Sequence, residues 1–540
     1  MKSRFSSRVV ILFFVWTALL LLALNGSVSL WDQDEAAYAG FAKRMAEGRN
    51  LIIPEFPWSE IHRKPPLHFW LMSLSYKLFG INEFAVRFFS ALAVWFSIWL
   101  IYRKGRRLTG KTAAFTAAVI MAGNVFVVML GKMAVTDGLL LFFYTWAGLS
   151  LMEYLLLNRK KALISFYTAL ALGTLVKGPP IILWAGFLWI LLWIFFPERQ
   201  KLTAMRPPLW GIAAILPFVA WLVKAWQINP DFVRWWTDWY VIRRTHSAVI
   251  GQTGPPGTYT LLFFLFGLAY LPLVAMVFVY LWKNRKSHDF IFRFLALWFV
   301  AGWLPYELLP SKLPAYVLAS YPAFALLAGK ALAENFYATH RFKFWERLQA
   351  VIFILLFLLS AILLVFEKTK IPSSYRIPLG VFAVITAVMA ALSLYVLHVK
   401  GGDKGKLYAA TSLVWVFLIY LILLPVVEPL KNAPKRTAAA LGRTDKVREI
   451  YVYNTFGHPP SLIFYLEKFN PQARIFLPSD TPSERLGKIP PYGTAYILSP
   501  AQWNHIPSSV QQHLHVIRIK GLHTGSVGEQ DYLIVYRADE

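Results

Sequence analysis

Cysteine is absent from this chain of 540 residues, and acidic residues are scarce, with 28 Asp and Glu against 55 Lys and Arg. The lack of cysteine excludes disulfide bonds and thiolate catalysis. No glycine-rich dinucleotide fingerprint precedes a helix, so the sequence implies no bound nucleotide sugar. Internal repeats and low-complexity tracts are also missing. Apolar sequence, by contrast, is abundant.

Hydrophobic residues make up 57% of the chain and form apolar runs from Val9 almost to Val427. Runs of about 18 to 24 residues are long enough to cross a bilayer and far exceed what a soluble core would use. We therefore expect a mainly α-helical, polytopic membrane protein with about 13 transmembrane helices, the first one retained rather than cleaved. The expected spans are 9–30, 83–101, 112–130, 138–157, 162–176, 178–196, 209–226, 259–282, 291–309, 315–333, 348–366, 377–397 and 407–427.

Basic residues cluster in every second loop between these spans, for example at 103–107 and 283–286. Because Lys and Arg concentrate on the cytoplasmic side, this alternation predicts a cytoplasmic N-terminus. An odd number of spans then places loops 31–82 and 227–258 and the C-terminal tail outside. The net charge of +27 is explained by this rule and by anionic lipid headgroups, so we expect membrane lipids and no nucleic acid as partners.

The composition changes at residue 428, where a linker containing two prolines begins. We expect a transmembrane domain over 1–427 and a small extracytoplasmic α/β domain over 428–540, with a helix near 461–468. Alternating apolar residues predict strands at 450–453, 474–477, 495–498, 516–519 and 532–536.

The loop 31–82 is the first candidate for a site, because its acids lie beside a basic turn. Asp34 follows the first span, with Tyr38 on the same helix face and with Asp32 and Glu35 as neighbours. A carboxylate here can orient or deprotonate an acceptor hydroxyl, or stabilise positive charge on a sugar ring. The alternative is a helix N-terminal acid that complements the macrodipole. Asp32 is the second choice for the same role.

Asp137 is a further acid at the outer face, where it opens the span 138–157. Thr136 or Asp137 can also serve only as a helix cap. The functional interpretation is favoured because acids from separate loops converge on one side of the membrane.

Basic residues also stand at the outer ends of spans, where they can snorkel or meet lipid headgroups. Since the outer side should be poor in Lys and Arg, their place in short proline-marked turns suits them better to hold a phosphate. An aromatic helix in the loop 227–258 is expected to lie in the membrane interface beside them. The candidate phosphate-binding residues are Lys64, Lys177, Arg244 and Lys312, and the aromatic residues are Trp235, Trp236, Trp239 and Tyr240.

Four motifs carry a resemblance to a known family. They are Asp34-Glu35-Ala36-Ala37-Tyr38-Ala39, Lys64-Pro65-Pro66-Leu67-His68-Phe69-Trp70, Leu175-Val176-Lys177-Gly178-Pro179 and Lys312-Leu313-Pro314-Ala315-Tyr316-Val317-Leu318. In this order they resemble the polyprenyl-phosphate-sugar transferases of the GT-C class. Within that class the chain is most similar to the aminoarabinose lipid A transferases and their protein O-mannosyltransferase relatives.

The resemblance implies roles for individual residues. Asp34 takes the place of the catalytic acid and Asp137 that of a second loop acid. Residues in the places that contact the lipid phosphate are Lys64, Lys177, Arg244 and Tyr316.

One departure concerns a divalent metal, the only cofactor that the resemblance brings into question. The aminoarabinose transferases have Glu before the Lys-Pro-Pro turn, where this chain has Arg63, and their His before the loop arginine is Val241 here. Both side chains are linked to a bound metal in that family. His62, His68 and His246 lie nearby, but isolated histidines are more often structural, and their spacing matches no zinc pattern.

The sequence thus predicts an integral membrane glycosyltransferase of a bacterial inner membrane. It would move aminoarabinose or a similar sugar from undecaprenyl phosphate to lipid A or another envelope acceptor, outside the cytoplasm. The alternatives are a protein O-mannosyltransferase-like enzyme and a transporter or flippase of lipid-linked sugars. A transporter should carry charges or broken helices at mid-bilayer, whereas most charges here lie at span ends.

Overall fold

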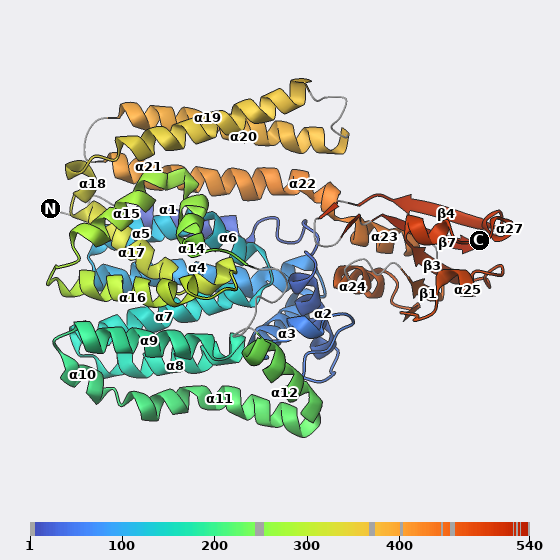
Figure 1. Ribbon diagram of the computed structural model, residues 1–540, viewed down its shortest axis with the longest axis horizontal. Helices are drawn as coiled ribbons and strands as arrows, with labels where there is room; N and C mark the ends of the chain where they lie inside the picture. The colour runs from blue at the N-terminus through green and yellow to red at the C-terminus, as the bar shows by residue number, and fades with distance from the viewer. Residues whose placement is uncertain are drawn as a thin grey trace.

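The computed structural model describes residues 6–243, 253–366, 373–399, 403–443, 447–453, 459–521, 523–524, 528–529 and 531–537. Arg244 and His246 lie outside the described residues. Long helices run side by side and form one bundle, and a β-sheet projects from one end of it (Figure 1). The N-terminal helix starts at the opposite end.

The bundle is built from helices that fall in all thirteen expected ranges. Shorter helices connect the helices in these ranges or lie at the bundle ends, and both kinds together make up the helical part of the chain. In chain order they are α1 (Ser7–Leu22), α2 (Asp34–Ala46), α3 (Leu67–Phe79), α4 (Glu83–Leu108), α5 (Lys111–Ala122), α6 (Val125–Lys132), α7 (Thr136–Leu157), α8 (Lys160–Lys177), α9 (Pro180–Phe195), α10 (Arg199–Ala204), α11 (Pro207–Ile228), α12 (Pro230–Thr237), α14 (Thr258–Phe266), α15 (Leu271–Lys283), α16 (Phe290–Glu307), α17 (Ser320–Ala333), α18 (Phe336–Thr339), α19 (Lys343–Phe366), α20 (Ser373–His398), α21 (Lys404–Phe417) and α22 (Leu424–Lys431).

The expected count of about 13 transmembrane helices is not confirmed. By length and composition, seven helices within the described ranges can cross a membrane, or up to nine if each of two bent pairs is one span. The pair α5 and α6 bends by 63° near Gly123, and the pair α14 and α15 bends by 73° near Gly267. Apolar residues flank both breaks, so the hydrophobic runs alone do not reveal them.

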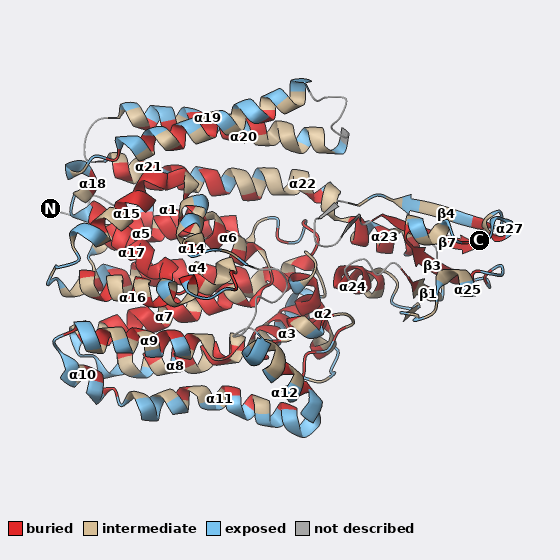
Figure 2. Cartoon of the chain, in the orientation of Figure 1, coloured by how far each residue is buried: buried red, intermediate tan, exposed pale blue. Residues whose placement is uncertain are grey.

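Burial separates inner from outer helices. Side chains of α4, α5, α7 and α17 are mostly buried, whereas α11, α19 and α20 present many exposed residues (Figure 2). Large apolar side chains such as Leu209 on α11 and Leu355 on α19 are 57% exposed. Apolar surface of this kind on the rim of a helical bundle is compatible with lipid rather than water.

The C-terminal segment forms a five-stranded sheet in the order β2-β1-β3-β7-β4. Strand β1 pairs in parallel with β2 and β3, and β7 pairs antiparallel with β3 and β4. All five predicted strands are confirmed by overlapping strands, and α24 (Pro460–Phe469) confirms the predicted helix. The strands are β1 (Glu449–Val452), β2 (Arg474–Phe476), β3 (Thr494–Leu498), β4 (Leu514–Ile519) and β7 (Tyr532–Arg537), next to the short pair β5 (His523–Thr524) and β6 (Gly528–Glu529).

Ion pairs dock this segment on the end of the bundle. Glu467 of α24 pairs with Lys43 and Arg44 of α2. Glu83, at the start of α4, pairs with Lys468 of α24 and with Lys435 of α23 (Ala433–Leu441). The sheet therefore lies at the end of the bundle where α2, α3 and α12 also lie (Figure 1).

Candidate functional site

Asp34 is the first residue of α2, at the bundle end nearest the sheet. No side-chain hydrogen bond caps this helix. Instead, the Oδ1 atom of Asp34 lies 2.5 Å from Nδ1 of His62, in the short helix η1 (Glu60–His62). The Asp34 side chain is 58% exposed, whereas the His62 side chain is 9% exposed. The carboxylate of Asp34 therefore does more than complement the N-terminus of α2, because it has a side-chain partner from a separate segment.

The surroundings keep Asp34 ionised. Burial alone would raise the pKa of Asp34, because neighbouring protein atoms desolvate its carboxylate. The hydrogen bond and charge of His62, followed by the charges of Lys64 and Lys177, outweigh this effect and lower the pKa to about 2. Two candidate phosphate-binding lysines therefore act on the candidate catalytic acid.

Lys64 is held beside the acid by the aromatic segment. Its Nζ atom donates to the hydroxyl of Tyr240 at 2.5 Å and lies 3.8 Å from the centroid of that ring. Tyr240 belongs to the π-helix η2 (Asp238–Arg243), and its hydroxyl donates to the Ile61 carbonyl at 2.7 Å. The predicted aromatic helix is present as α12 and η2. Trp236 of α12 is buried against Phe218 of α11. Tyr240 of η2 contacts Lys64 in the Lys-Pro-Pro turn.

Asp137 and Lys177 form an ion pair across a helical hairpin. Nζ of Lys177 lies 2.5 Å from Oδ1 of Asp137. Asp137 stands in the first turn of α7, and Lys177 ends α8, where Gly178 with φ 83° stops the helix. An acid at a helix N-terminus and a base at a C-terminus are both favoured by the macrodipole. Asp137 therefore pairs with a base rather than capping α7.

Glu35 has a different environment from its neighbour Asp34. It is 1% exposed, and its two carboxylate oxygens each lie 2.8 Å from nitrogens of Arg87 on α4. It also accepts from the backbone of Trp31 and Ala134. Glu35, Arg87 and Ala134 are buried and Trp31 is partly buried, which places Glu35 in the framework beneath the site.

Asp32 connects the loop to the C-terminal segment. Its carboxylate accepts hydrogen bonds from the backbone and the hydroxyl of Ser461, at the start of α24. Burial raises the pKa of Asp32 to about 6, although the bonds from Ser461 and the charge of Lys431 oppose this rise. Asp32 thus contributes to docking of the C-terminal segment.

Lys312 and Tyr316 lie around the end of α16. The ammonium of Lys312, with a side chain 3% exposed, donates to the carbonyls of Tyr306 and Glu307 at 3.0 and 2.7 Å. Tyr316, in the 3-10 helix η5 (Pro314–Val317), packs its ring 5.7 Å from Tyr306. Lys312 therefore stabilises a helix terminus in this structure.

The remaining candidates are packing residues. Tyr38 is 2% exposed and packs edge-on against Phe69 at 5.3 Å between ring centroids. The guanidinium of Arg63 lies over the rings of Phe232 and Trp235, at 5.7 and 5.9 Å. Both connect the loop to neighbouring helices.

His62 is the partner that sequence reasoning missed. It was one of three isolated histidines without metal-ligand spacing, and a structural role was the default interpretation. The separation of 28 positions between Asp34 and His62 gives no periodic signal. The one available hint was its position two residues before Lys64 of the family motif.

The described residues do not fit a divalent metal. Arg63 places a cation directly before the Lys-Pro-Pro turn, where the family resemblance would lead us to expect a carboxylate. Within the described part of the chain, no three His, Asp or Glu side chains are grouped so that they could hold a metal ion.

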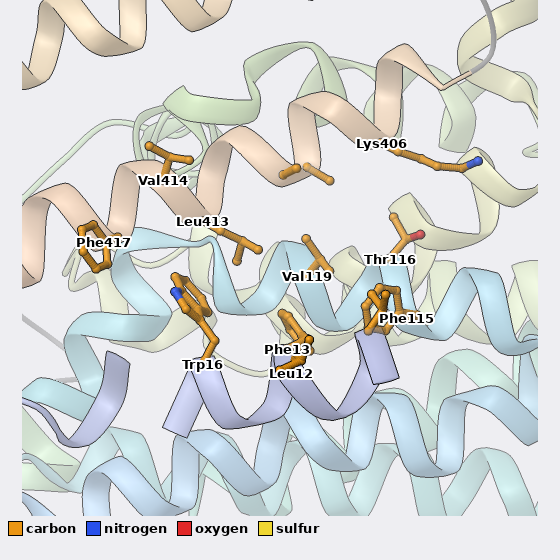
Figure 3. A pocket seen from close by; sticks show the side chains of 13 residues that line it. Leu12, Phe13, Trp16, Phe115, Thr116, Val119, Lys406, Leu413, Val414 and Phe417 are labelled. Atoms are coloured by element: carbon orange, nitrogen blue, oxygen red, sulfur yellow. The ribbon is translucent and has the colours of Figure 1, made fainter. Parts of the chain in front are cut away.

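Two cavities differ in the side chains that line them. One of about 360 Å³ lies in loop 31–82 and is lined by Arg44, Arg49 and Arg63 together with Glu55 and Glu60. The other, of about 670 Å³, lies between α1, α5 and α21 and is lined mainly by apolar side chains (Figure 3). The second contains none of the candidate site residues, and Lys406 is the one charged side chain in its lining.

Comparisons with known proteins point to one group. The family model for dolichyl-phosphate-mannose-protein mannosyltransferase matches residues 63–224. The undecaprenyl phosphate-alpha-4-amino-4-deoxy-L-arabinose arabinosyl transferase of Photorhabdus laumondii is 28% identical over 329 residues, which cover 59% of this chain and 58% of the relative. The transferase of the same name from Edwardsiella ictaluri is 30% identical over 304 residues, 55% of this chain and 54% of the relative. The matches therefore span less than two thirds of these relatives.

The fold gives a broader match. The crystal structure of ArnT from Cupriavidus metallidurans bound to undecaprenyl phosphate superposes with a TM-score of 0.74 and 18% identity, covering 99% of both chains. The apo state of the same protein gives a TM-score of 0.72. In sequence and in fold, then, the chain resembles the GT-C class transferases of the aminoarabinose type, and the resemblance drawn from its motifs is confirmed.

Proposed function

We propose that this protein is an integral membrane glycosyltransferase that takes a sugar from undecaprenyl phosphate and places it on lipid A or another acceptor in the cell envelope. The observation that carries the proposal is the ionised carboxylate of Asp34 held among His62, Lys64 and Lys177 at one end of the bundle. A carboxylate suits a developing sugar cation, and lysines suit a departing phosphate. The names of the arabinosyl transferase relatives include undecaprenyl phosphate and 4-amino-4-deoxy-L-arabinose. These names favour aminoarabinose or a similar sugar as the group that is transferred here.

In the proposed reaction the bond between the anomeric carbon and the phosphate oxygen breaks, and its electron pair leaves with the phosphate. The acceptor oxygen forms the new bond to the same carbon. Lys64 and Lys177 stabilise the leaving phosphate by charge-assisted hydrogen bonds. Asp34, with a pKa of about 2, is a weak base, so it stabilises positive charge on the sugar ring rather than removing a hydroxyl proton. This role favours an acceptor oxygen that is already ionised.

We place the reaction on the extracytoplasmic side of a bacterial inner membrane. The alternating basic loops support a cytoplasmic N-terminus, and the sheet and Asp34 lie at the bundle end opposite the N-terminal helix. The C-terminal domain from residue 428 would then be periplasmic. Fusion of a phosphatase or a fluorescent protein to the C-terminus tests this orientation, and cytoplasmic fluorescence would contradict it.

A second candidate, transfer of a sugar to protein, is favoured by the mannosyltransferase family match over 63–224. Both candidates are tested by incubating the purified protein with undecaprenyl-phosphate-linked aminoarabinose or mannose, and with lipid A or peptide acceptors. Mass spectrometry of the products identifies the transfer. A glycolipid product supports the first candidate, a glycopeptide supports the second, and vectorial movement of the donor without a product would contradict both.

A further inference from the structure

His62 has a role in none of the steps above, yet it makes the one hydrogen bond to the side chain of Asp34 found within the described ranges. Its ring is nearly enclosed, with 9% of the side chain exposed, while the Asp34 side chain is 58% exposed. The backbone of His62 is itself fixed, because its N–H donates to the Ser59 carbonyl at 3.0 Å. A rigidly held ring thus contacts an open carboxylate.

The direction of this hydrogen bond follows from the chemistry of the pair. An ionised carboxylate only accepts, so Nδ1 of His62 carries the proton and donates to Oδ1 of Asp34. The other oxygen, Oδ2, accepts no hydrogen bond from any described residue. His62 therefore restrains one oxygen, and the second keeps its capacity to accept a hydrogen bond from a substrate. Without this bond, an exposed aspartate at an uncapped helix start would sample several rotamers.

We propose that His62 is a positioning residue that orients the carboxylate of Asp34 so that Oδ2 faces the reacting sugar. The proposal rests on the proposed function of Asp34. It extends that function because the alternative for His62, a buried ring that merely fills space, needs no donor at Nδ1. Orientation matters since displacement of a catalytic group by about 1 Å can cost 100-fold in rate.

Charged groups around the pair define a pH signature. Asp34 is faced by His62 from η1, by Lys64 from the following turn and by Lys177 from α8, and His62 is faced by Asp32. The hydrogen bond and charge of His62 both lower the pKa of Asp34. Removal of the imidazole should therefore raise the pKa of Asp34 and move protonation of this carboxyl to higher pH, while the two lysines remain.

The activity test compares His62→Leu with His62→Asn in the full-length protein. Asparagine can place an N–H donor near the position of Nδ1, whereas leucine has none. We expect kcat to fall about 100-fold in His62→Leu, with KM for the undecaprenyl-phosphate sugar within about threefold, and to recover largely in His62→Asn. Equal rates in the two variants, or an effect on KM alone, would overturn the proposal.

A second measurement needs no transfer activity. A carbodiimide reacts with a protonated carboxyl, so the labelling of Asp34 as a function of pH, quantified by peptide mass spectrometry, reports its protonation. At pH 4 to 5 we expect about tenfold more labelling in His62→Leu than in the wild type, and less than twofold more in His68→Asn, which alters a buried histidine whose ring contacts the Ala134 carbonyl rather than Asp34. Identical labelling curves for wild type and His62→Leu would overturn the pairing. A shifted curve in a protein that transfers no sugar would instead refute the proposed function alone.

Discussion

Two neighbouring acids at the start of α2 have opposite environments. Glu35 is buried against Arg87, with both carboxylate oxygens bonded to one guanidinium, and serves the framework. The Asp34 side chain is 58% exposed, has one oxygen that accepts no hydrogen bond from the described residues, and is surrounded by His62 and two lysines. The surroundings lower the pKa of both carboxyls, so both are ionised. The difference is access: a fully satisfied buried pair has no remaining capacity for a substrate, whereas an open and partly satisfied one has.

The largest expected effect is the loss of transfer activity when Asp34 is replaced. Asp34→Asn removes the charge opposite the reacting sugar, and we expect transfer to fall about 1000-fold while the melting temperature stays unchanged. Asp32→Asn is the matched control on the same loop, and its activity should stay within about tenfold of wild type. Product formation by mass spectrometry and thermal unfolding in detergent measure the two quantities. Wild-type turnover in Asp34→Asn would remove Asp34 from the mechanism.

The second prediction tests the framework side of the comparison. Glu35→Gln leaves Arg87 as an uncompensated buried charge, and breaking such a pair costs about 3–5 kcal/mol in the free energy of unfolding. The double replacement Glu35→Leu with Arg87→Leu should be less destabilising, because both charges are removed together. Thermal and denaturant unfolding provide the measurement. If Glu35→Gln were as stable as wild type but inactive, Glu35 would belong to the site and not to the framework.

The third prediction distinguishes lysines that face the site from one that does not. Lys64→Met and Lys177→Met should each weaken binding of the undecaprenyl-phosphate donor by about 1.5–3 kcal/mol, since each loses a charge-assisted hydrogen bond. Lys312→Met should leave donor binding unchanged and lower stability, because its ammonium is used by the α16 carbonyls. The apparent KM for the donor and the melting temperature decide between them. A raised KM in Lys312→Met would bring this residue back into the phosphate site.

The smallest expected effect lies at the docked C-terminal segment. Lys468→Ala removes one of two lysines that pair with Glu83, and the other, Lys435, remains. Because these lysines are partly solvent-exposed, we expect a loss of no more than about 1 kcal/mol in the free energy of unfolding. Added salt should reduce the difference between the variant and the wild type. A loss of several kcal/mol would mean that this contact holds the segment in place.

Some features of the site follow from the sequence because they are local. Asp34 at a helix start, Asp137 at the opening of α7 and Lys177 before Gly178 were predicted at the same outer face, and the structure places all three at one end of the bundle. The five strands and α24 were also predicted, since alternating apolar residues and turn residues act over a few positions. Such signals need no knowledge of distant partners.

Pairings between segments far apart in the chain were not available from the sequence. Nothing local joins His62 to Asp34 or Lys64 to Tyr240, which is 176 residues away. The sequence also does not show that Glu35 pairs with Arg87, or that Lys312 donates to carbonyls of α16. Both are predicted site candidates, and in the structure both make contacts that stabilise the fold. The number of spans also stayed open, because apolar runs on both sides of Gly123 and Gly267 conceal sharp bends.

The sequence by itself determined a membrane-embedded helical protein, the loops that carry its charges and the family it resembles, because hydrophobic run length, loop charge and short motifs are properties of contiguous residues. Tertiary structure alone decided which charges are buried and which stay open, because packing brings distant residues together and desolvates them unequally. For this protein that decision separates Asp34 from Glu35, two carboxylates that are adjacent in the chain.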